Sequence, residues 1–220
     1  MISELLLYGI FGIIGSLTIA AGDMFLLGNP VSGKTFRQRK LDNLLHVSTR
    51  NMWIGHTIGV LAIPIVFFGI YQIYLGLSPA GGSTALVPPA IMMFMMVVGG
   101  AGHACFAFLG GAMQLHASQN PEEGSPIDNL VKAHRKLLTP LFAAFLLSLL
   151  AFSIAFAVIV WTIDTSYPKW IAITNPLVLF IATGKLAGLL PAPMGGYVRP
   201  ATGNIAFAIF FGLSTFALVN

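Results

Sequence analysis

The sequence predicts an all-α protein, a polytopic membrane bundle of about six transmembrane helices, on the strength of three observations. Of its 220 residues, 56% are hydrophobic and only 8% are charged, whereas roughly a quarter are charged in an ordinary soluble domain. The mean hydropathy is +0.86. The apolar residues form runs of about 20, the length of helix that crosses a bilayer. Because the loops between these runs are short, residues 1–220 are expected to form a single domain.

Six apolar runs are interpreted as the spans. They cover residues 5–28, 52–77, 86–115, 137–163, 170–190 and 204–219. The first lacks the basic leader of a signal peptide and is therefore expected to be a retained helix. Its small and polar residues recur every three or four positions, which makes one helical face that ends at Asp23. Pro64 should kink the second span, because proline removes a backbone hydrogen bond.

The later spans differ in composition. Pro88 and Pro89 suit the first turn of the third span. Four methionines that follow them are expected to face lipid: Met92, Met93, Met95 and Met96. The fourth span is rich in phenylalanine and leucine and is predicted to form a lipid-facing wall. Asn175-Pro176 interrupts the fifth span, and such interruptions can line a cavity. The Pro- and Gly-rich loop before the sixth leaves room for one extra re-entrant or interfacial helix.

The distribution of basic residues predicts the orientation in the membrane. The loops after spans one, three and five hold five, three and one basic residues, and Lys169 is alone on the other side. The positive-inside rule then places those three loops in the cytoplasm and both termini outside. We therefore expect a multi-pass protein of the bacterial cytoplasmic (inner) membrane. The net charge of +4 comes from these loops and does not indicate nucleic-acid binding.

His103 lies in the middle of the apolar third span, among small residues. Gly99, Ala107 and Gly111 share its helical stripe at four-residue spacing, so they lie on one face. Small residues allow neighbouring helices to approach closely, and an imidazole in hydrocarbon needs a polar partner. The other helices are therefore expected to close on this one.

Three other ionisable residues lie within the predicted spans, all toward the cytoplasmic side. Asp23, His56 and Lys185 are each roughly 6–8 Å inside, and His103 is roughly 18 Å inside, at about 1.5 Å of helix per residue. Charges at that depth cost about 2.5–3.5 kcal/mol or more each, so they should face a cavity or one another. These four are the predicted catalytic residues. Nearby residues are predicted to bind substrate: Arg50, Trp53, Asn175 and Asn204.

Each of the four also has a structural interpretation that the sequence leaves open. Asp23 could pair with Arg50 or a loop lysine at the helix end, and His56 could be a solvated interfacial group. His103 could donate to a backbone carbonyl on a close neighbour. Lys185 could extend to the cytoplasmic surface while its aliphatic stem stays in the bilayer.

The sequence contains no HExxH, GxSxG or paired-cysteine motif, so the constellation of polar residues suggests the function. One class is a small intramembrane enzyme acting on a lipid or isoprenoid. It would be an acid–base isomerase or cyclase, or a hydrolase whose metal ion is held by Asp23, His56 and His103.

Two further classes stay open. One is a transporter or channel for a small solute or lipid, because ionisable residues and a broken helix fit such proteins. The other is a haem redox module with His56 and His103 as axial ligands. The sequence identifies no cofactor. Membrane lipids and a hydrophobic small molecule are the expected partners, and the Gly-rich faces would allow a homodimer.

Five stretches carry a resemblance to a known family. They are residues 21–24 (AGDM), 99–110 (GGAGHACFAFLG), 167–179 (YPKWIAITNPLVL), 190–196 (LPAPMGG) and 203–211 (GNIAFAIFF). Together they resemble a family of uncharacterised bacterial multi-pass membrane proteins, described only as a domain of unknown function. The resemblance spans nearly the whole chain and places Asp23, His103 and Asn175 in a shared pattern. It implies no activity, so the functional prediction depends on the residues alone.

Overall fold

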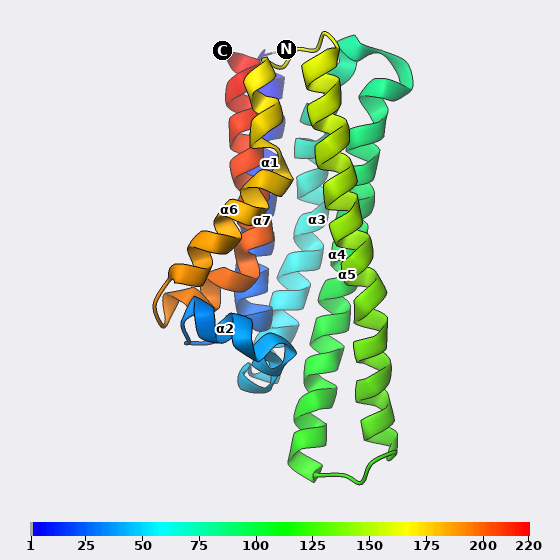
Figure 1. Cartoon of the computed structure of the whole chain (residues 1–220), viewed down its shortest axis with the longest axis vertical. Helices are drawn as coiled ribbons and strands as arrows, with labels where there is room; N and C mark the ends of the chain where they lie inside the picture. The colour runs from blue at the N-terminus through cyan, green and yellow to red at the C-terminus, as the bar shows by residue number, and fades with distance from the viewer. Residues whose placement is uncertain (1) are drawn as a thin grey trace.

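The computed structural model describes residues 2–220 and shows an all-α bundle whose helices run up and down (Figure 1). Five of the described helices are long and apolar enough to cross a membrane. They are α1 (Ile2–Leu27), α3 (Thr49–Leu77), α4 (Gly82–Gln119), α5 (Pro126–Thr162) and α7 (Met194–Val219), and a short 3-10 turn, η2 (Ser78–Ala80), joins α3 to α4. The start of α1 and the end of α7 lie at the same end of the molecule. The predicted fold class is confirmed.

The predicted fifth span is a broken segment rather than one long helix. A 3-10 turn, η3 (Lys169–Thr174), is followed by α6 (Pro176–Leu189), which has 14 residues. Between them the Asn175 side chain accepts a hydrogen bond from the backbone N–H of Val178 at 3.3 Å. Proline then takes the first helical position, where a missing N–H breaks no helical bond. In Figure 1 the segment runs obliquely from the end that bears the termini toward α2.

Other helices extend beyond their predicted spans. The loop after α1 is mostly helical, because α2 (Gly33–Arg39) and η1 (Lys40–His46) occupy it. α4 and α5 have 38 and 37 residues and project past α2 as a hairpin (Figure 1). Polar contacts support the end of this hairpin, where the Asp128 carboxylate lies 2.8 Å from Lys132 and 3.6 Å from His116. The polar ends of both helices therefore stay helical outside the apolar runs.

Glycines bring α1 into close contact with α3. A Cβ on Gly12 would lie 2.8 Å from the Cα of Gly69, and one on Gly22 would lie 2.8 Å from the carbonyl oxygen of Gly55. Any larger residue would push the two backbones apart, as at other small-residue contacts between membrane helices. α1 also packs against α7, and α4 packs against α5. The small-residue face of the first span is therefore a helix–helix interface.

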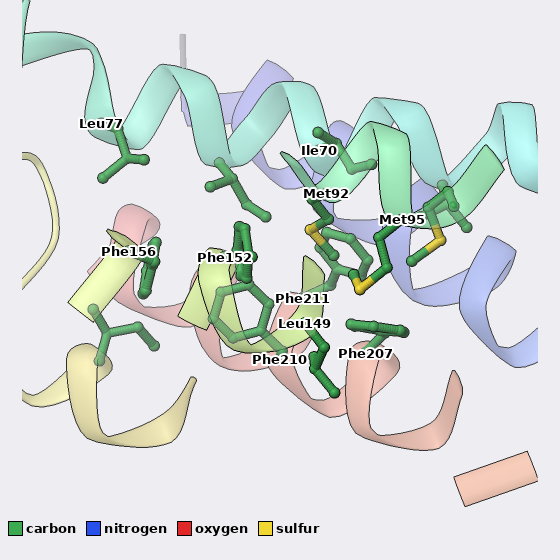
Figure 2. Close-up of a cluster of buried hydrophobic side chains, with 14 of the residues drawn as sticks. Ile70, Leu77, Met92, Met95, Leu149, Phe152, Phe156, Phe207, Phe210 and Phe211 are labelled. Atoms are coloured by element: carbon green, nitrogen blue, oxygen red, sulfur yellow. The ribbon is translucent and has the colours of Figure 1, made fainter. Parts of the chain in front are cut away.

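The largest apolar core lies toward the end of the bundle that bears the termini. Phe152 and Phe156 of α5 meet Phe210 and Phe211 of α7, and all four are fully buried (Figure 2). The rings of Phe156 and Phe210 pack edge to face with centroids 5.3 Å apart, a favourable aromatic geometry. One face of α5 is core, while its other face exposes large apolar residues such as Leu147, Ile154 and Trp161, as expected for a lipid-facing wall. The prediction for the methionines is wrong, because three of the four expected to face lipid are buried.

A buried polar network, here called the Gln72 cluster, consists of Gln72, Tyr167, Ser214 and Thr215. The Gln72 amide donates to the Leu5 carbonyl at 2.8 Å and to the Thr215 hydroxyl at 3.0 Å, and its oxygen accepts from Ser214 at 3.3 Å. Since the single Ser214 proton goes to Gln72, the Tyr167 hydroxyl donates to Ser214, at 2.7 Å. Burial raises the pKa of the Tyr167 phenol, which keeps it a donor. No sequence pattern predicted this network, which joins α1, α3, α7 and the loop before η3.

Candidate functional site

Three polar side chains from three helices meet inside the bundle and are here called the Asp23 cluster: Asp23 of α1, His103 of α4 and Asn204 of α7. The His103 Nε2 atom lies 3.0 Å from the Asp23 Oδ1 atom. The Asn204 amide donates to the other carboxylate oxygen at 2.7 Å. Asp23 and His103 are both buried, with exposed fractions of 7% and 9%. The predicted convergence of Asp23 and His103 is thus present, and Asn204 joins them.

Gly59 of α3 makes the position of the His103 ring possible. A Cβ at residue 59 would overlap the ring atoms Cε1 and Nδ1 of His103. One turn away, Gly55 brings α3 against Gly22 of α1, next to Asp23. Close packing of α3 on α1 and the missing side chain at Gly59 therefore hold the imidazole against the carboxylate.

The hydrogen-bond partners favour one tautomer of His103. Its Nδ1 atom is buried and has no partner among residues 2–220. A proton on Nδ1 would therefore be an unsatisfied buried donor, which costs about 1–3 kcal/mol. With the proton on Nε2, the ring donates to Asp23, and the carboxylate accepts one N–H on each oxygen. Each carboxylate oxygen has two lone pairs, so Asp23 keeps acceptor capacity for another group.

The Asp23 cluster lines an apolar cavity of about 410 Å³. Its volume falls in the range of small-molecule sites, roughly 300–1,000 Å³. Its walls come from α1, α3, α4, α5, α6, α7 and the α2 region. Most of the large side chains in these walls are apolar: Met95, Met96, Phe106, Phe142, Phe145 and Phe180. A hydrophobic molecule in this cavity would lie directly against a carboxylate and an imidazole.

A second cavity of about 680 Å³ lies between α2, α6 and α7 and is here called the basic cavity. Lys34, Arg37, Lys185 and Arg199 line it. The basic cavity adjoins the apolar one, because Arg37 and Arg199 line both. Lys34 and Arg37 were not predicted as site residues, because the basic residues of this loop were interpreted only as a signal for orientation. The feature that could have indicated them is the short basic segment that follows the helical face ending at Asp23.

His56 and Trp53 lie outside the lining of both cavities. Their rings pack together with centroids 6.0 Å apart, and Trp53 also packs edge to face on Phe108 at 5.3 Å. The His56 Nδ1 atom is buried without a partner in the described part of the chain. His56 lies close enough to His103 for an electrostatic interaction, but neither His56 nor Trp53 lines a cavity.

The other predicted residues have separate positions. Lys185 lines the basic cavity and does not reach the Asp23 cluster. Arg50 is exposed at the start of α3 and lines neither cavity. Asn175 caps α6, and its amide also donates to the Ala172 carbonyl at 2.9 Å. For Asn175 the structural explanation is complete, because both ends of its side chain have backbone partners.

Two alternatives left open by the sequence do not fit this geometry: a metal ion held by Asp23, His56 and His103, and a haem held by His56 and His103. Within residues 2–220, no three His, Cys, Asp or Glu side chains are placed to hold one metal ion, so His56 does not complete a set with Asp23 and His103. For haem, the His103 Nε2 atom is already bonded to Asp23. Its Nδ1 atom faces Gly59 of α3, which leaves no room there for a macrocycle.

Among residues 2–220, five helices are long enough to span a bilayer. A buried carboxylate–imidazole pair lies beside an apolar cavity within this bundle. These features define a polytopic α-helical membrane protein with an internal polar site. The chain belongs to the family of unknown function DUF6796, whose sequence model matches residues 1–220. The predicted resemblance to an uncharacterised family is confirmed. Searches of curated proteins and of solved structures find no match.

Proposed function

We propose that this protein is a small intramembrane enzyme that acts on a lipid or isoprenoid by acid–base chemistry. The observation that carries the proposal is the Asp23–His103 pair, at 3.0 Å, in the wall of an apolar cavity. A proton on carbon is best moved by a carboxylate that water does not solvate, and a positioned acid or base contributes about 10²–10⁴-fold to a rate. An isomerase or cyclase is the reaction class that needs only these groups.

In this proposal each member of the cluster has a distinct role. Asp23 faces the cavity and takes or returns the proton. His103 donates its Nε2 proton to one carboxylate oxygen, and Asn204 donates to the other. Both donors hold the carboxylate in one orientation. His103 and Asn204 are therefore positioning residues, and Asp23 is the catalytic residue.

The test is solvent-isotope incorporation. The protein is reconstituted in nanodiscs with a bacterial lipid and isoprenoid extract in heavy water, and lipids that gain deuterium on carbon are sought by mass spectrometry. The wild-type protein should label one lipid class, and Asp23→Asn should not. Tyr167→Phe, in the Gln72 cluster, is the matched control and should label normally. A wild-type protein that neither labels nor converts any lipid would overturn the proposal.

Transport of a small solute or lipid is a second candidate function. The observation in its favour is the break at Asn175 between η3 and α6, because α6 lines both cavities further along, at Phe180. Broken helices and polar residues near them recur in transporters. Liposomes containing the protein should then take up a labelled solute, or move a labelled lipid from one leaflet to the other. Asp23→Asn should slow this transport.

We also propose that the end of the bundle bearing α2 faces the cytoplasm of a bacterial cell, with both termini outside. The support is the positive charge on α2 and its neighbouring loops, which favours the cytoplasmic side. Alkaline phosphatase is active only outside the cytoplasmic membrane. A fusion at the C-terminus should be active, and a fusion after Glu123 should be inactive.

A further inference from the structure

We propose that the ligand of this protein carries a phosphate headgroup, which binds in the basic cavity while the attached apolar chain lies in the apolar cavity beside Asp23. This inference rests on the proposed lipid chemistry and names its substrate class, a lipid or isoprenoid phosphate. Three features of the basic cavity support this ligand: its charges, the position of its arginines and its place beside the apolar cavity.

The basic cavity gathers four positive side chains from three elements: Lys34 and Arg37 of α2, Lys185 of α6 and Arg199 of α7. No Asp or Glu lines this cavity. None of the ion pairs within residues 2–220 involves any of the four. Four positive charges without a carboxylate attract an anion, and basic pockets between membrane helices bind anionic lipid headgroups.

The two arginines of the basic cavity, Arg37 and Arg199, are placed to hold a phosphate. The Arg199 guanidinium donates to the Gly184 carbonyl of α6, which fixes its position in the cavity wall. Arg37 and Arg199 line the same cavity. Like charges repel each other, so an anion that contacts both would relieve the repulsion. Guanidinium groups bind phosphate oxygens with two parallel hydrogen bonds, which makes arginine well suited to this ligand.

The two cavities adjoin each other, because four residues line both: Arg37, Phe180, Arg199 and Thr202. The cationic cavity therefore lies beside the apolar cavity that the Asp23 cluster lines. A free phosphate would leave the apolar cavity unfilled, and a neutral lipid would leave the four cations unpaired. An amphiphile with a phosphate head satisfies both parts.

The test is competition for radiolabelled dodecyl phosphate. Binding is measured on the protein in phosphatidylcholine nanodiscs, and binding to empty nanodiscs is subtracted. Unlabelled dodecyl phosphate should displace the label, and equal concentrations of dodecanol or inorganic phosphate should not. Equal displacement by inorganic phosphate would show a site for free phosphate only, and equal displacement by dodecanol would show that the headgroup is not recognised. Either result would overturn the proposal.

A pair of double variants tests which charges matter. Lys34→Gln with Arg37→Gln should weaken binding about 25-fold, at about fivefold for each basic side chain near an anionic headgroup. Arg50→Gln with Lys136→Gln removes the same charge from exposed residues that line neither cavity and should bind like the wild type. Unchanged binding in the first variant, or equal weakening in both, would overturn the proposal. All four positions are exposed, so both variants should fold.

The failure of this inference is distinguishable from the failure of the proposed function. Binding of dodecyl phosphate requires no turnover, and Asp23→Asn should retain it. If binding follows the expected pattern but no lipid gains deuterium, the enzymatic proposal fails and the headgroup site stands. If a lipid is labelled but Lys34→Gln with Arg37→Gln binds dodecyl phosphate like the wild type, the headgroup site fails and the enzymatic proposal stands.

Discussion

The two buried polar clusters of this bundle differ in what surrounds them. In the Gln72 cluster each hydrogen-bonding group described above has a partner, and none of its four residues lines either cavity. In the Asp23 cluster all three residues line a cavity of about 410 Å³, and the Nδ1 atom of His103 has no partner within residues 2–220.

The difference supports the two roles proposed for them. A closed network gains stability when every member is satisfied, and this one links α1, α3 and α7 near the termini. The proposed site for chemistry needs acceptor capacity directed at a ligand, which Asp23 retains. Buried polarity alone therefore does not identify a functional site. Buried polarity with an adjoining cavity is the stronger indication.

The largest effect should come from Asp23→Asn. The amide cannot take a proton, so activity should fall about 10²–10⁴-fold if Asp23 is the acid–base group. The rate of deuterium incorporation into lipid measures this loss, and the thermal unfolding midpoint measures the stability of the same sample. If Asp23→Asn lowers the stability but the folded variant keeps full activity, the role of the Asp23 cluster is structural, like that of the Gln72 cluster.

Asn204→Ala should have the next largest effect. It removes the 2.7 Å hydrogen bond to the Asp23 carboxylate, and bonds to charged groups contribute about 1.5–3 kcal/mol. Activity should therefore fall roughly 10- to 100-fold, with substrate binding less affected than turnover. Comparison of kcat with KM separates the two. An unchanged kcat would show that the orientation of Asp23 does not depend on Asn204.

Gly59→Ala should displace the His103 ring, because the added Cβ overlaps it. Overpacking of this kind costs about 1–3 kcal/mol, and activity should fall together with stability. Gly111→Ala is the matched control on α4, since a Cβ there has no neighbour within 4 Å. Helix propensity predicts that the control is neutral or slightly more stable. Equal effects of the two changes would refute the role assigned to Gly59.

The smallest effect should come from Tyr167→Phe. It removes one hydrogen bond, to Ser214, and should lower the free energy of unfolding by about 1 kcal/mol. Activity per folded molecule should stay at the wild-type level, because the cavities lie elsewhere. Chemical unfolding in detergent micelles measures the free energy of unfolding, and a parallel deuterium-labelling assay measures the activity. Lost activity at unchanged stability would contradict the division between the two clusters.

Part of the fold could be predicted from residues alone. Apolar runs form helices in a bilayer because lipid offers the backbone no hydrogen-bond partners, and the break at Asn175-Pro176 follows from a cap and a proline. The lengths of α4 and α5 could not be predicted in this way, because contacts such as that between Asp128 and Lys132 keep their polar ends helical. A homodimer and the orientation in the membrane stay predictions.

The candidate site could be predicted only in part. Depth and polarity singled out Asp23 and His103, which meet. They also singled out His56, which does not line the cavity beside that pair, and Lys185, which lines the other cavity. Sequence spacing places a residue along a helix, whereas the face that it presents to its neighbours depends on how the helix packs. The same limit explains why Gln72 went unnoticed, although it is as deeply buried as any residue in the core.

The sequence by itself determined the class of protein, the positions of the apolar helices and the short list of residues expensive to bury. Only the tertiary structure decided which of those residues meet and which lie beside a cavity. The physical reason is that the rotation of each helix about its axis is set by close packing, here by Gly12, Gly22, Gly55 and Gly69 between α1 and α3. That packing brings Asp23 to His103 and leaves His56 outside the cavity lining.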